Sequence, residues 1–429
     1  MNTATPPPGP RQMLWTPTFI LFLVYAFIIL TNRIPGATFV MGAALLSLLV
    51  QRQALRAPPF FWLLAAWLGW AVLGYAVTSY PDRVWASLTE HGKILLVVLV
   101  AVNALRTPAQ IRVFLILLVV SYILFPIRST LTNYLLGYTL LGRAVGPFVY
   151  QNPNDLAAHT ILMLGPALAL VTTQARKGLL RWFALGAIVL LLITILLTQS
   201  RGGFLGLLGL GLPAGIGLAR RRPRLVPVCA ALVGLALLFA PAGLWDRLGG
   251  LTKAANVETI RDMDPEGSAE QRFAVLKTAA RIVSDHPMLG IGLGAYGFAN
   301  ADYSPALGLK DTHNTYMNVA AETGLPGLAL FLALITNVLL GARAARRRGA
   351  NAASPAQREI VRWLQLAVIG YLIAGVFGSY ARLSVPYVFL ALLWSASRVA
   401  TAQRLVVVPR GDVPAPSPIA PDQAIASGA

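Results

Sequence analysis

Long apolar runs without charged residues set the first constraint on this chain. Residues 182–198, WFALGAIVLLLITILLT, contain no Asp, Glu, Lys or Arg, and similar runs recur along the sequence. A helix needs about 20 mostly apolar residues to cross a bilayer, and the runs lack the alternation expected of membrane-spanning strands. The composition agrees, with 56% hydrophobic residues, 12% charged residues and a mean hydropathy of +0.66. The sequence therefore predicts an all-α polytopic membrane protein.

The apolar runs divide the chain into about twelve expected transmembrane helices. We place nine of them in residues 1–244, one long loop at 245–312, three more helices in 313–400, and a disordered Pro/Ala-rich tail at 401–429. The fourth helix has the least apolar start, because Glu90, His91 and Lys93 crowd it. The expected spans are 14–31, 34–50, 59–79, 90–105, 109–127, 155–173, 182–198, 203–219, 225–244, 325–342, 361–379 and 384–400.

The distribution of Lys and Arg orients these helices, since cytoplasmic loops are enriched in both residues. With the N-terminus inside, 21 of the 35 cations fall in cytoplasmic segments, 7 in short outer loops and 7 in the long loop. Both termini are thus expected in the cytoplasm. The net charge of +19 reports topology and not a nucleic-acid partner. The runs RRRPR (220–224) and RAARRRG (343–349) are expected to lie against anionic membrane lipid.

Polar residues gather at the starts of three helices that would all begin at the outer face. Helix N-termini carry unpaired N–H groups and a partial positive charge, so they favour anions. Three such ends with an Arg suggest a phosphate or pyrophosphate site, and Gly202 and Gly203 would let backbone approach the ligand. The candidate residues are Arg143, Asn152, Asn154 and Asp155 before the sixth span, Ser200 and Arg201 before the eighth, and His313 before the tenth.

Structural explanations compete with each of these motifs. Asn-Pro-Asn-Asp at a helix start is typical of capping, and an Arg in a tight turn can reach the interface without binding anything. Asn314, Tyr316, Asn318 and Glu322 follow His313, and the amides and Glu322 recur every four residues. This polar stripe would orient His313 or bind sugar, while capping and helix packing explain it equally well.

The long loop contains one strong helix signal, residues 268–287. Ser268 and Gln271 form a capping-box pattern, and Pro287 follows the expected end. We expect an amphipathic helix lying over the spans. Its expected buried stripe is Phe273, Leu276, Ala280 and Val283, with Lys277 and Arg281 on another face and Arg272 undecided between solvent and the site.

Two further segments of the loop suggest cofactor motifs, and the sequence argues against both. GIGLGAYG (290–297) lacks the strand–helix context of a dinucleotide site, so a flexible turn is expected. RDMDPEG (261–267) does not have the carboxylate spacing of a calcium loop. With Cys229 as the only cysteine, neither a disulfide nor a cysteine metal site is available. No cofactor is expected.

HNTYMNVAAETGLPG, the loop helix with RFAVL, TQSRGG and NPND together resemble the O-antigen ligase/polymerase superfamily. The motifs cover roughly residues 140–330, and the topology covers the chain. The resemblance implies a glycosyltransferase-C-like fold in the bacterial inner membrane and a periplasmic active site. It also implies metal-independent, inverting transfer of glycan from undecaprenyl pyrophosphate to lipid A–core. By their motifs, His313 takes the place of the family's catalytic His, and Arg201 and Arg272 those of its essential Arg residues.

Several alternatives remain at this point. A polymerase of the same superfamily would use a second lipid-linked glycan as acceptor. A protein-directed oligosaccharyltransferase is a third possible enzyme. A lipid-linked glycan transporter or flippase is the alternative that is not an enzyme. Transporters usually place charges or broken helices near the midplane. Here the polar groups gather at one face, which favours an enzyme.

Overall fold

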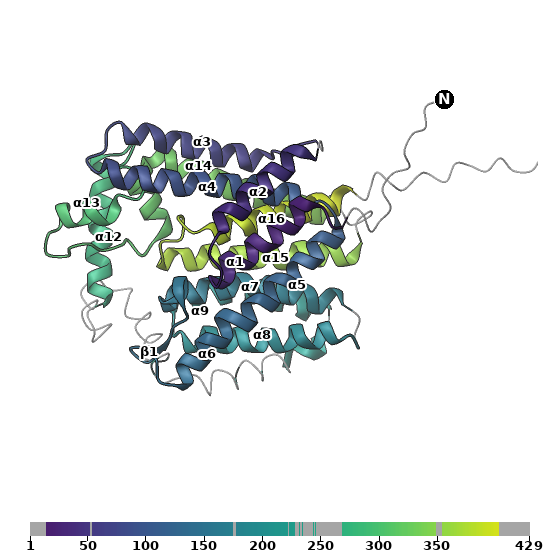
Figure 1. Cartoon of the computed structure of the whole chain (residues 1–429). Helices are drawn as coiled ribbons and strands as arrows, with labels where there is room; N and C mark the ends of the chain where they lie inside the picture. The colour runs from purple at the N-terminus through teal and green to yellow at the C-terminus, as the bar shows by residue number, and fades with distance from the viewer. Residues whose placement is uncertain are drawn as a thin grey trace, which may run out of the picture.

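The computed structural model is a bundle of α-helices. It describes residues 14–51, 54–174, 177–221, 223–227, 268–348 and 354–402, with positions 231, 234, 243 and 245. Figure 1 shows long helices side by side, with α12, α13 and β1 at one end. We call this the site end. The helices are α1 (Pro17–Thr31), α2 (Ala37–Val50), α3 (Pro59–Tyr75), α4 (Pro81–Ala104), α5 (Pro108–Tyr122), α6 (Arg128–Leu135), α7 (Pro153–Thr173), α8 (Leu179–Leu197), α9 (Arg201–Arg221), α12 (Ser268–Asp285), α13 (Tyr296–Tyr303), α14 (Thr315–Arg348), α15 (Pro355–Ala374) and α16 (Ser384–Ala402).

Every expected span except the ninth corresponds to one of these helices. Seven described helical segments are long and apolar enough to cross a membrane, and α1, α2 and α3 are shorter apolar helices. The prediction of an all-α polytopic membrane protein is therefore confirmed, while the total of twelve spans stays a prediction. Most of the ninth span, the acidic segment 261–267 and the tail from residue 403 lie outside the described residues.

Several helix boundaries differ from the expected ones. Proline opens α1, α3, α4, α5, α7 and α15, where its missing N–H costs no hydrogen bond. Because the first turns of α4 are polar, hydropathy alone placed its start nine residues too late. A π-helical turn at Ile123–Ile127, containing Pro126, joins α5 to α6, so this helix runs on to Leu135.

The core of the bundle is built around α7, which packs against α5, α8, α9 and α15. Small residues bring these helices close together, as in other membrane proteins. A Cβ atom on Gly206 of α9 would lie 2.5 Å from the carbonyl oxygen of Gly370 in α15, and one on Gly370 would lie 2.6 Å from that of Gly206. The backbones of α9 and α15 are therefore in direct contact at this crossing.

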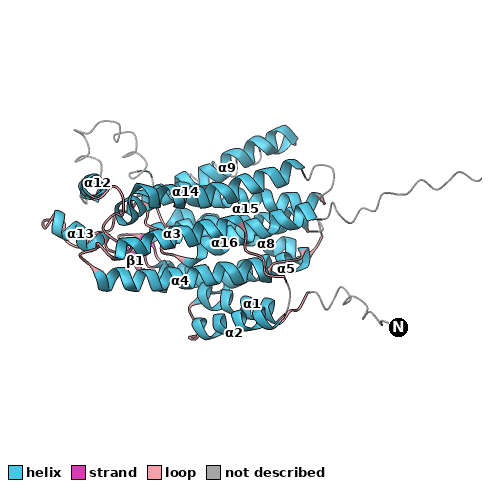
Figure 2. Cartoon of the chain, turned by 90° about the horizontal axis from the view of Figure 1, so that it is seen from above, coloured by secondary structure: helices cyan, strands magenta, loops and turns pink. Residues whose placement is uncertain are grey.

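The amphipathic helix predicted in the loop is present as α12, but its buried face is a different one. Val275, Ala279 and Ile282 are buried, whereas Phe273 is 47% exposed. Helix α12 packs on α14 and α13 and lies across the site end, where Figure 2 shows it nearly end-on. The expected stripe was wrong because a short helix touching two neighbours buries a face that hydrophobicity alone does not identify.

A break in α14 separates its first turns from the rest of the helix. Gly324 has φ 70° and ψ −179°, a conformation accessible essentially only to glycine. Pro326 has no N–H to donate to the carbonyl of Glu322, and the N–H of Leu325 donates to Pro287 instead of the preceding turn. The helix is thus divided into a short outer piece, Thr315–Thr323, and the long span that follows.

The segment before α13 donates hydrogen bonds to the carbonyl groups at the break in α14. The N–H groups of Ile291 and Gly292 donate to the carbonyls of Ala321 and Glu322, each at 3.0 Å. The indole N–H of Trp70 donates to the carbonyl of Thr323 at 3.0 Å. The expected flexible turn at 290–297 is therefore a buried, hydrogen-bonded segment, and its glycines at 290, 292 and 294 all have positive φ.

We expect Gly324→Ala to destabilise the protein strongly. A Cβ atom there would lie 2.0 Å from the carbonyl oxygen of Met288, and the backbone strain alone costs about 1–3 kcal/mol. Thermal unfolding in detergent should show a much lower midpoint. The matched control is Gly341→Ala in the same helix, where a Cβ meets nothing within 4 Å. Equal midpoints for the two variants would contradict this account of the break.

Candidate functional site

The N-terminal ends of α7, α9 and α14 are joined by hydrogen bonds at the site end. The buried Asn154 of α7 accepts a hydrogen bond from the Ser200 hydroxyl before α9 at 2.8 Å. Tyr380, in the loop before α16, donates from its hydroxyl to the carbonyl of Asn154 at 3.1 Å. Its N–H donates to the hydroxyl of Thr315 at 3.0 Å. The structure thus brings together the three helix starts identified in the sequence.

Several residues expected to contact substrate are hydrogen-bonded to each other. The buried Arg143, on strand β2 (Arg143–Ala144), donates to the side-chain oxygen of Asn154 at 2.9 Å and to the carbonyl of Thr198 at 2.8 Å. Asn152 caps α7 by accepting from the N–H of Asn154 at 2.8 Å. Strand β2 pairs antiparallel with β1 (Thr139–Leu140). These contacts hold the ends of three helices and a hairpin in register.

Arg201 is the first residue of α9 and is half-buried. The two glycines after it were expected to make room for a ligand, but protein fills that space. A Cβ atom on Gly202 would lie 2.6 Å from the Cβ of Phe377, and one on Gly203 would lie 2.6 Å from the Cβ of Ala157. Their small size lets α9 start in direct contact with α7 and the end of α15, which fixes the position of Arg201.

His313 lies in a tight turn just before α14. Its φ of 49° is unusual for a residue other than glycine, and such strain often accompanies functional positions. The turn is anchored by Thr312, which is 1% exposed. The Thr312 hydroxyl donates to the carbonyl of Asn314 at 3.0 Å and lies 2.9 Å from the hydroxyl of Ser379 and 3.1 Å from the side-chain oxygen of Asn318.

The polar stripe after His313 serves the fold of this turn. The side-chain oxygen of Asn314 accepts hydrogen bonds from the N–H groups of Tyr316 and Met317, each at 3.0 Å, and so caps α14. Glu322 is buried and accepts from the N–H of Tyr296 at 3.3 Å. The sequence left two explanations for this stripe, sugar binding or orientation of His313 on one side and capping with helix packing on the other. Capping and helix packing account for these contacts.

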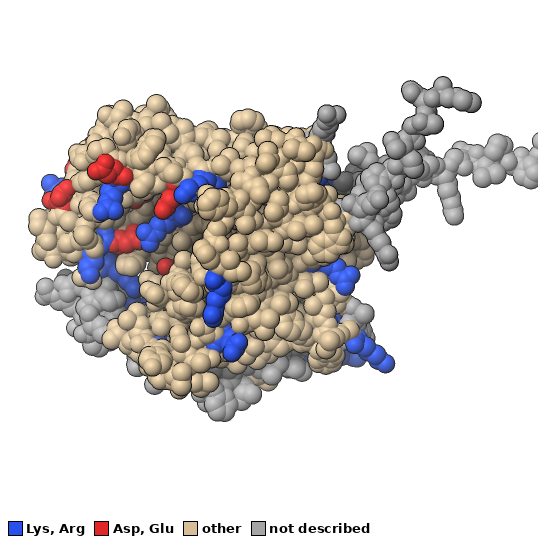
Figure 3. Space-filling model, viewed as in Figure 1, with Lys and Arg blue, Asp and Glu red and all other residues tan. Residues whose placement is uncertain are grey.

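A polar cavity of about 180 Å³ lies between α12 and the turn that carries His313. Its lining residues come from two places, Gln271, Arg272 and Val275 on α12 and Lys310, Asp311 and His313 before α14. Figure 3 shows a hollow at this end of the molecule with acidic and basic side chains around it. The cavity therefore combines an imidazole, two cations and a carboxylate in a small volume.

The environment of His313 favours its neutral form. Burial lowers the pKa of His313, and the positive charges of Arg272 and Lys310 lower it further, while Asp311 opposes them. A neutral imidazole has a free ring nitrogen that can accept a proton near neutral pH. The charges around His313 thus suit a general base.

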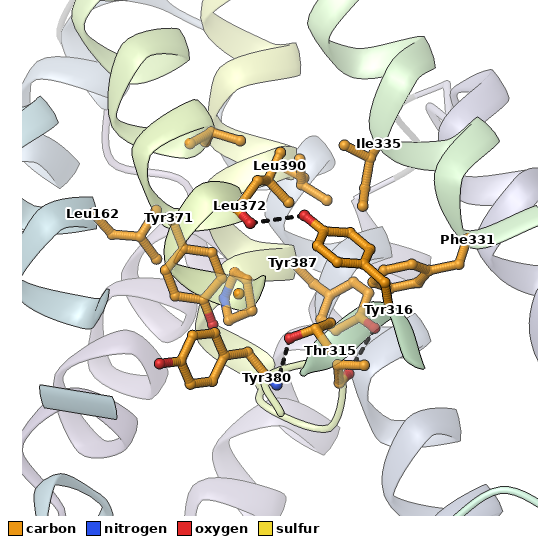
Figure 4. A pocket seen from close by; sticks show the side chains of 14 residues that line it. Leu162, Thr315, Tyr316, Phe331, Ile335, Tyr371, Leu372, Tyr380, Tyr387 and Leu390 are labelled. Atoms are coloured by element: carbon orange, nitrogen blue, oxygen red, sulfur yellow. Dashed lines mark hydrogen bonds between the residues drawn. The ribbon is translucent and has the colours of Figure 1, made fainter. Parts of the chain in front are cut away.

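The remaining predicted site residues do not line this cavity. Lys277 and Arg281 are exposed on α12, and Arg281 lies 4.0 Å from Asp285. Tyr316 donates to the carbonyl of Leu372 at 2.8 Å and lines a separate apolar cavity of about 40 Å³ inside the bundle. Figure 4 shows that cavity, with Tyr316, Tyr371 and Tyr380 around it.

Some residues of the site were not selected from the sequence. Lys310, Gln271 and Val275 line the cavity, and Arg382 interacts electrostatically with Asp155 at the start of α7. The sequence could have pointed to Arg382, since it is one of the few cations in a short outer loop. For Lys310 the only indication was its position three residues before His313 in the sequence. The described residues contain no cluster of three or more His, Cys, Asp or Glu side chains suited to a metal ion.

We expect Thr312→Val to loosen the His313 turn. The change keeps the side-chain shape and removes a buried hydroxyl, and leaving its partners unpaired costs about 1–3 kcal/mol. Thermal unfolding in detergent should show a clear loss for Thr312→Val and a much smaller one for Thr312→Ser, which keeps the hydroxyl. A valine variant as stable as the wild type would mean that these hydrogen bonds do not hold the turn.

Comparison with known proteins agrees with this geometry. Residues 186–332, about a third of the chain, match the family model described as O-antigen ligase. The matched segment includes Arg201, α12 with Arg272, and His313. A search of curated proteins found no match. The matched segment holds the start of α9, the loop helix α12 and the turn with His313, and the match supports a relationship of the chain to the O-antigen ligase superfamily.

Proposed function

We propose that the protein is an O-antigen ligase. It transfers glycan from undecaprenyl pyrophosphate to a sugar hydroxyl of lipid A–core. The observation that carries this proposal is the cavity in which His313 lies beside Arg272, Lys310 and Asp311. The match of residues 186–332 to the O-antigen ligase family model supports a membrane enzyme acting on lipid-linked glycan. The donor, the acceptor and the role of each residue are part of the proposal.

His313 is the proposed general base. Its neutral ring nitrogen takes the proton of the acceptor hydroxyl as that oxygen attacks the anomeric carbon of the donor sugar. A carbon–oxygen bond forms on one face of the sugar while the bond to the pyrophosphate breaks on the other, so the configuration inverts. The proton on His313 then leaves to solvent, and undecaprenyl pyrophosphate is released.

Cationic groups would stabilise the leaving pyrophosphate. Arg272 and Lys310 line the cavity with His313. Arg201 is the first residue of α9, and hydrogen bonds join the N-terminal end of α9 to the N-terminal ends of α7 and α14. A guanidinium stays charged at all working pH values and can pair two phosphate oxygens at once. Helix N-termini add unpaired N–H groups to the same region. We propose that these groups do the work that a divalent metal does in other transferases.

The charge distribution supports a membrane orientation for this chemistry. Cations concentrate in the loops at the end of the bundle opposite the site, which by the positive-inside rule would be cytoplasmic. Both termini would then be cytoplasmic, and the site would open to the periplasm from the inner membrane. Lipid-linked glycan and lipid A–core would both reach the cavity from the outer leaflet.

A reconstituted transfer assay tests this function. Purified full-length protein is mixed with undecaprenyl-pyrophosphate glycan, with and without lipid A–core. We expect product only with lipid A–core, and a loss of at least about a hundredfold in His313→Ala, as for other general bases. The matched control is His286→Ala, which changes an exposed His bonded to Tyr303 and should leave transfer intact.

The other outcomes point elsewhere. Longer lipid-linked chains formed without lipid A–core would make the protein a polymerase. Full activity in His313→Ala would remove the base assignment. No covalent product with either acceptor would favour transport of the lipid-linked glycan.

The pH dependence of transfer gives a second test. Only neutral His313 acts as a base, so activity is present above its pKa and is lost as the pH falls through it. Lys310→Gln removes a charge that lowers this pKa, so the acid limb of the kcat/KM profile should move to higher pH. Asp311→Asn removes a charge that raises it, so the limb should move to lower pH. Shifts in the same direction would show that another group controls the limb.

A further inference from the structure

A second polar cavity lies at the opposite end of the bundle from the His313 site. It occupies about 600 Å³ between the last turns of α14 and the first turns of α15. Because α14 starts at the site end and runs for 34 residues, this cavity is separated from the transfer site by the length of the helix. Its charged residues are Arg343, Arg346 and Arg347 on α14 and Arg358, Glu359 and Arg362 on α15.

Positive charge is in excess in this cavity. Five arginines face one carboxylate, that of Glu359, which lies 3.6 Å from the guanidinium of Arg362. Arg346 is half-buried, and its nearest charges include three other arginines. Its Nε atom is buried and has no hydrogen-bond partner among the described residues. Crowded guanidinium groups repel one another, so a bound anion would stabilise this arrangement.

Arg362 on α15 is held in place by packing. The side chain of Arg362 is only 15% exposed, and its guanidinium lies 5.1 Å from the ring centroid of Trp363. On its other side, Gly217 of α9 leaves the space that the guanidinium occupies, and a Cβ atom at that position would overlap it. A surface Arg in solvent has no such fixed position, so this is a built site.

We propose that this cavity binds the headgroup of a membrane lipid that carries more than one phosphate. Guanidinium groups pair phosphate oxygens in bidentate geometry, and five of them exceed what a single phosphate needs. A soluble polyphosphate has the same chemistry. The cavity favours a lipid because its walls are the ends of two membrane-spanning helices, where headgroups lie. A basic pocket between transmembrane helices is a known kind of lipid site.

Native mass spectrometry of the full-length protein in detergent tests the proposal. The probes are tetraoleoyl cardiolipin, which has two phosphates, and dioleoyl phosphatidylethanolamine, which has no net charge. We expect selective retention of cardiolipin by the wild type. Arg346→Gln with Arg362→Gln should weaken this retention on the order of tenfold or more, from the loss of two cations near the headgroup. Arg343→Gln with Arg347→Gln provides a second lining pair whose members are exposed, in case the first pair disturbs folding.

The matched control is Arg220→Gln with Arg224→Gln, which removes the same charge from exposed residues that do not line the cavity. This pair should retain cardiolipin as the wild type does. Equal losses in the control and lining pairs would reduce the effect to net charge and overturn the site. Displacement of cardiolipin by equimolar inorganic pyrophosphate would assign the cavity to a soluble anion instead. Equal retention of both lipids would overturn the proposal entirely.

Discussion

The hydrogen bonds across the break in α14 determine how the site end is built. A continuous helix would have satisfied the carbonyls of Ala321, Glu322 and Thr323 internally. Gly324 and Pro326 prevent this, and the N–H groups of Ile291, Gly292 and Trp70 take over. The same contacts attach the loop before α13 to the bundle. The break in α14 thus sets where its long span begins. It also provides the carbonyl groups to which the loop before α13 is bonded.

The cavity around His313 depends on a second set of contacts that joins separate parts of the chain. Asn154 connects the starts of α7 and α9, and Tyr380 connects α7 to α14. Thr312 then holds the turn from which His313 projects. The residues that hold this arrangement are mostly neutral and buried, whereas four of the six residues that line the cavity are ionisable. Positioning and chemistry are therefore divided between different side chains.

The sequence was sufficient for the large features and insufficient for side-chain roles. Apolar length predicted the spans, since a bilayer imposes that length directly, and helix-start residues predicted which ends meet. Arg143, Asn154 and Gly202 were assigned to ligand binding because polar and small residues suit both ligands and helix contacts. Which of these uses applies depends on neighbours distant in sequence, such as Ser200 for Asn154 and Phe377 for Gly202. The buried face of α12 was missed for the same reason.

The break in α14 also bears on how sequence predictions of membrane proteins go wrong. Hydropathy started the tenth span at Leu325, one residue after Gly324, because residues 314–322 include Asn314, Asn318 and Glu322. Residues 315–323 are helical all the same, with Asn314 capping the helix and Glu322 bonded to the start of α13. Composition therefore indicates where the apolar stretch of the sequence begins, whereas hydrogen bonding determines where the helix begins.

The two walls of the cavity belong to different elements, Arg272 to α12 and His313 to the turn before α14. The proton affinity of the imidazole therefore depends on where α12 lies. A displacement that takes Arg272 away from the ring removes a repelling charge and makes His313 easier to protonate. By thermodynamic reciprocity, protonation of His313 would disfavour the position of α12 beside it. The position of α12 and the proton affinity of His313 are thus coupled.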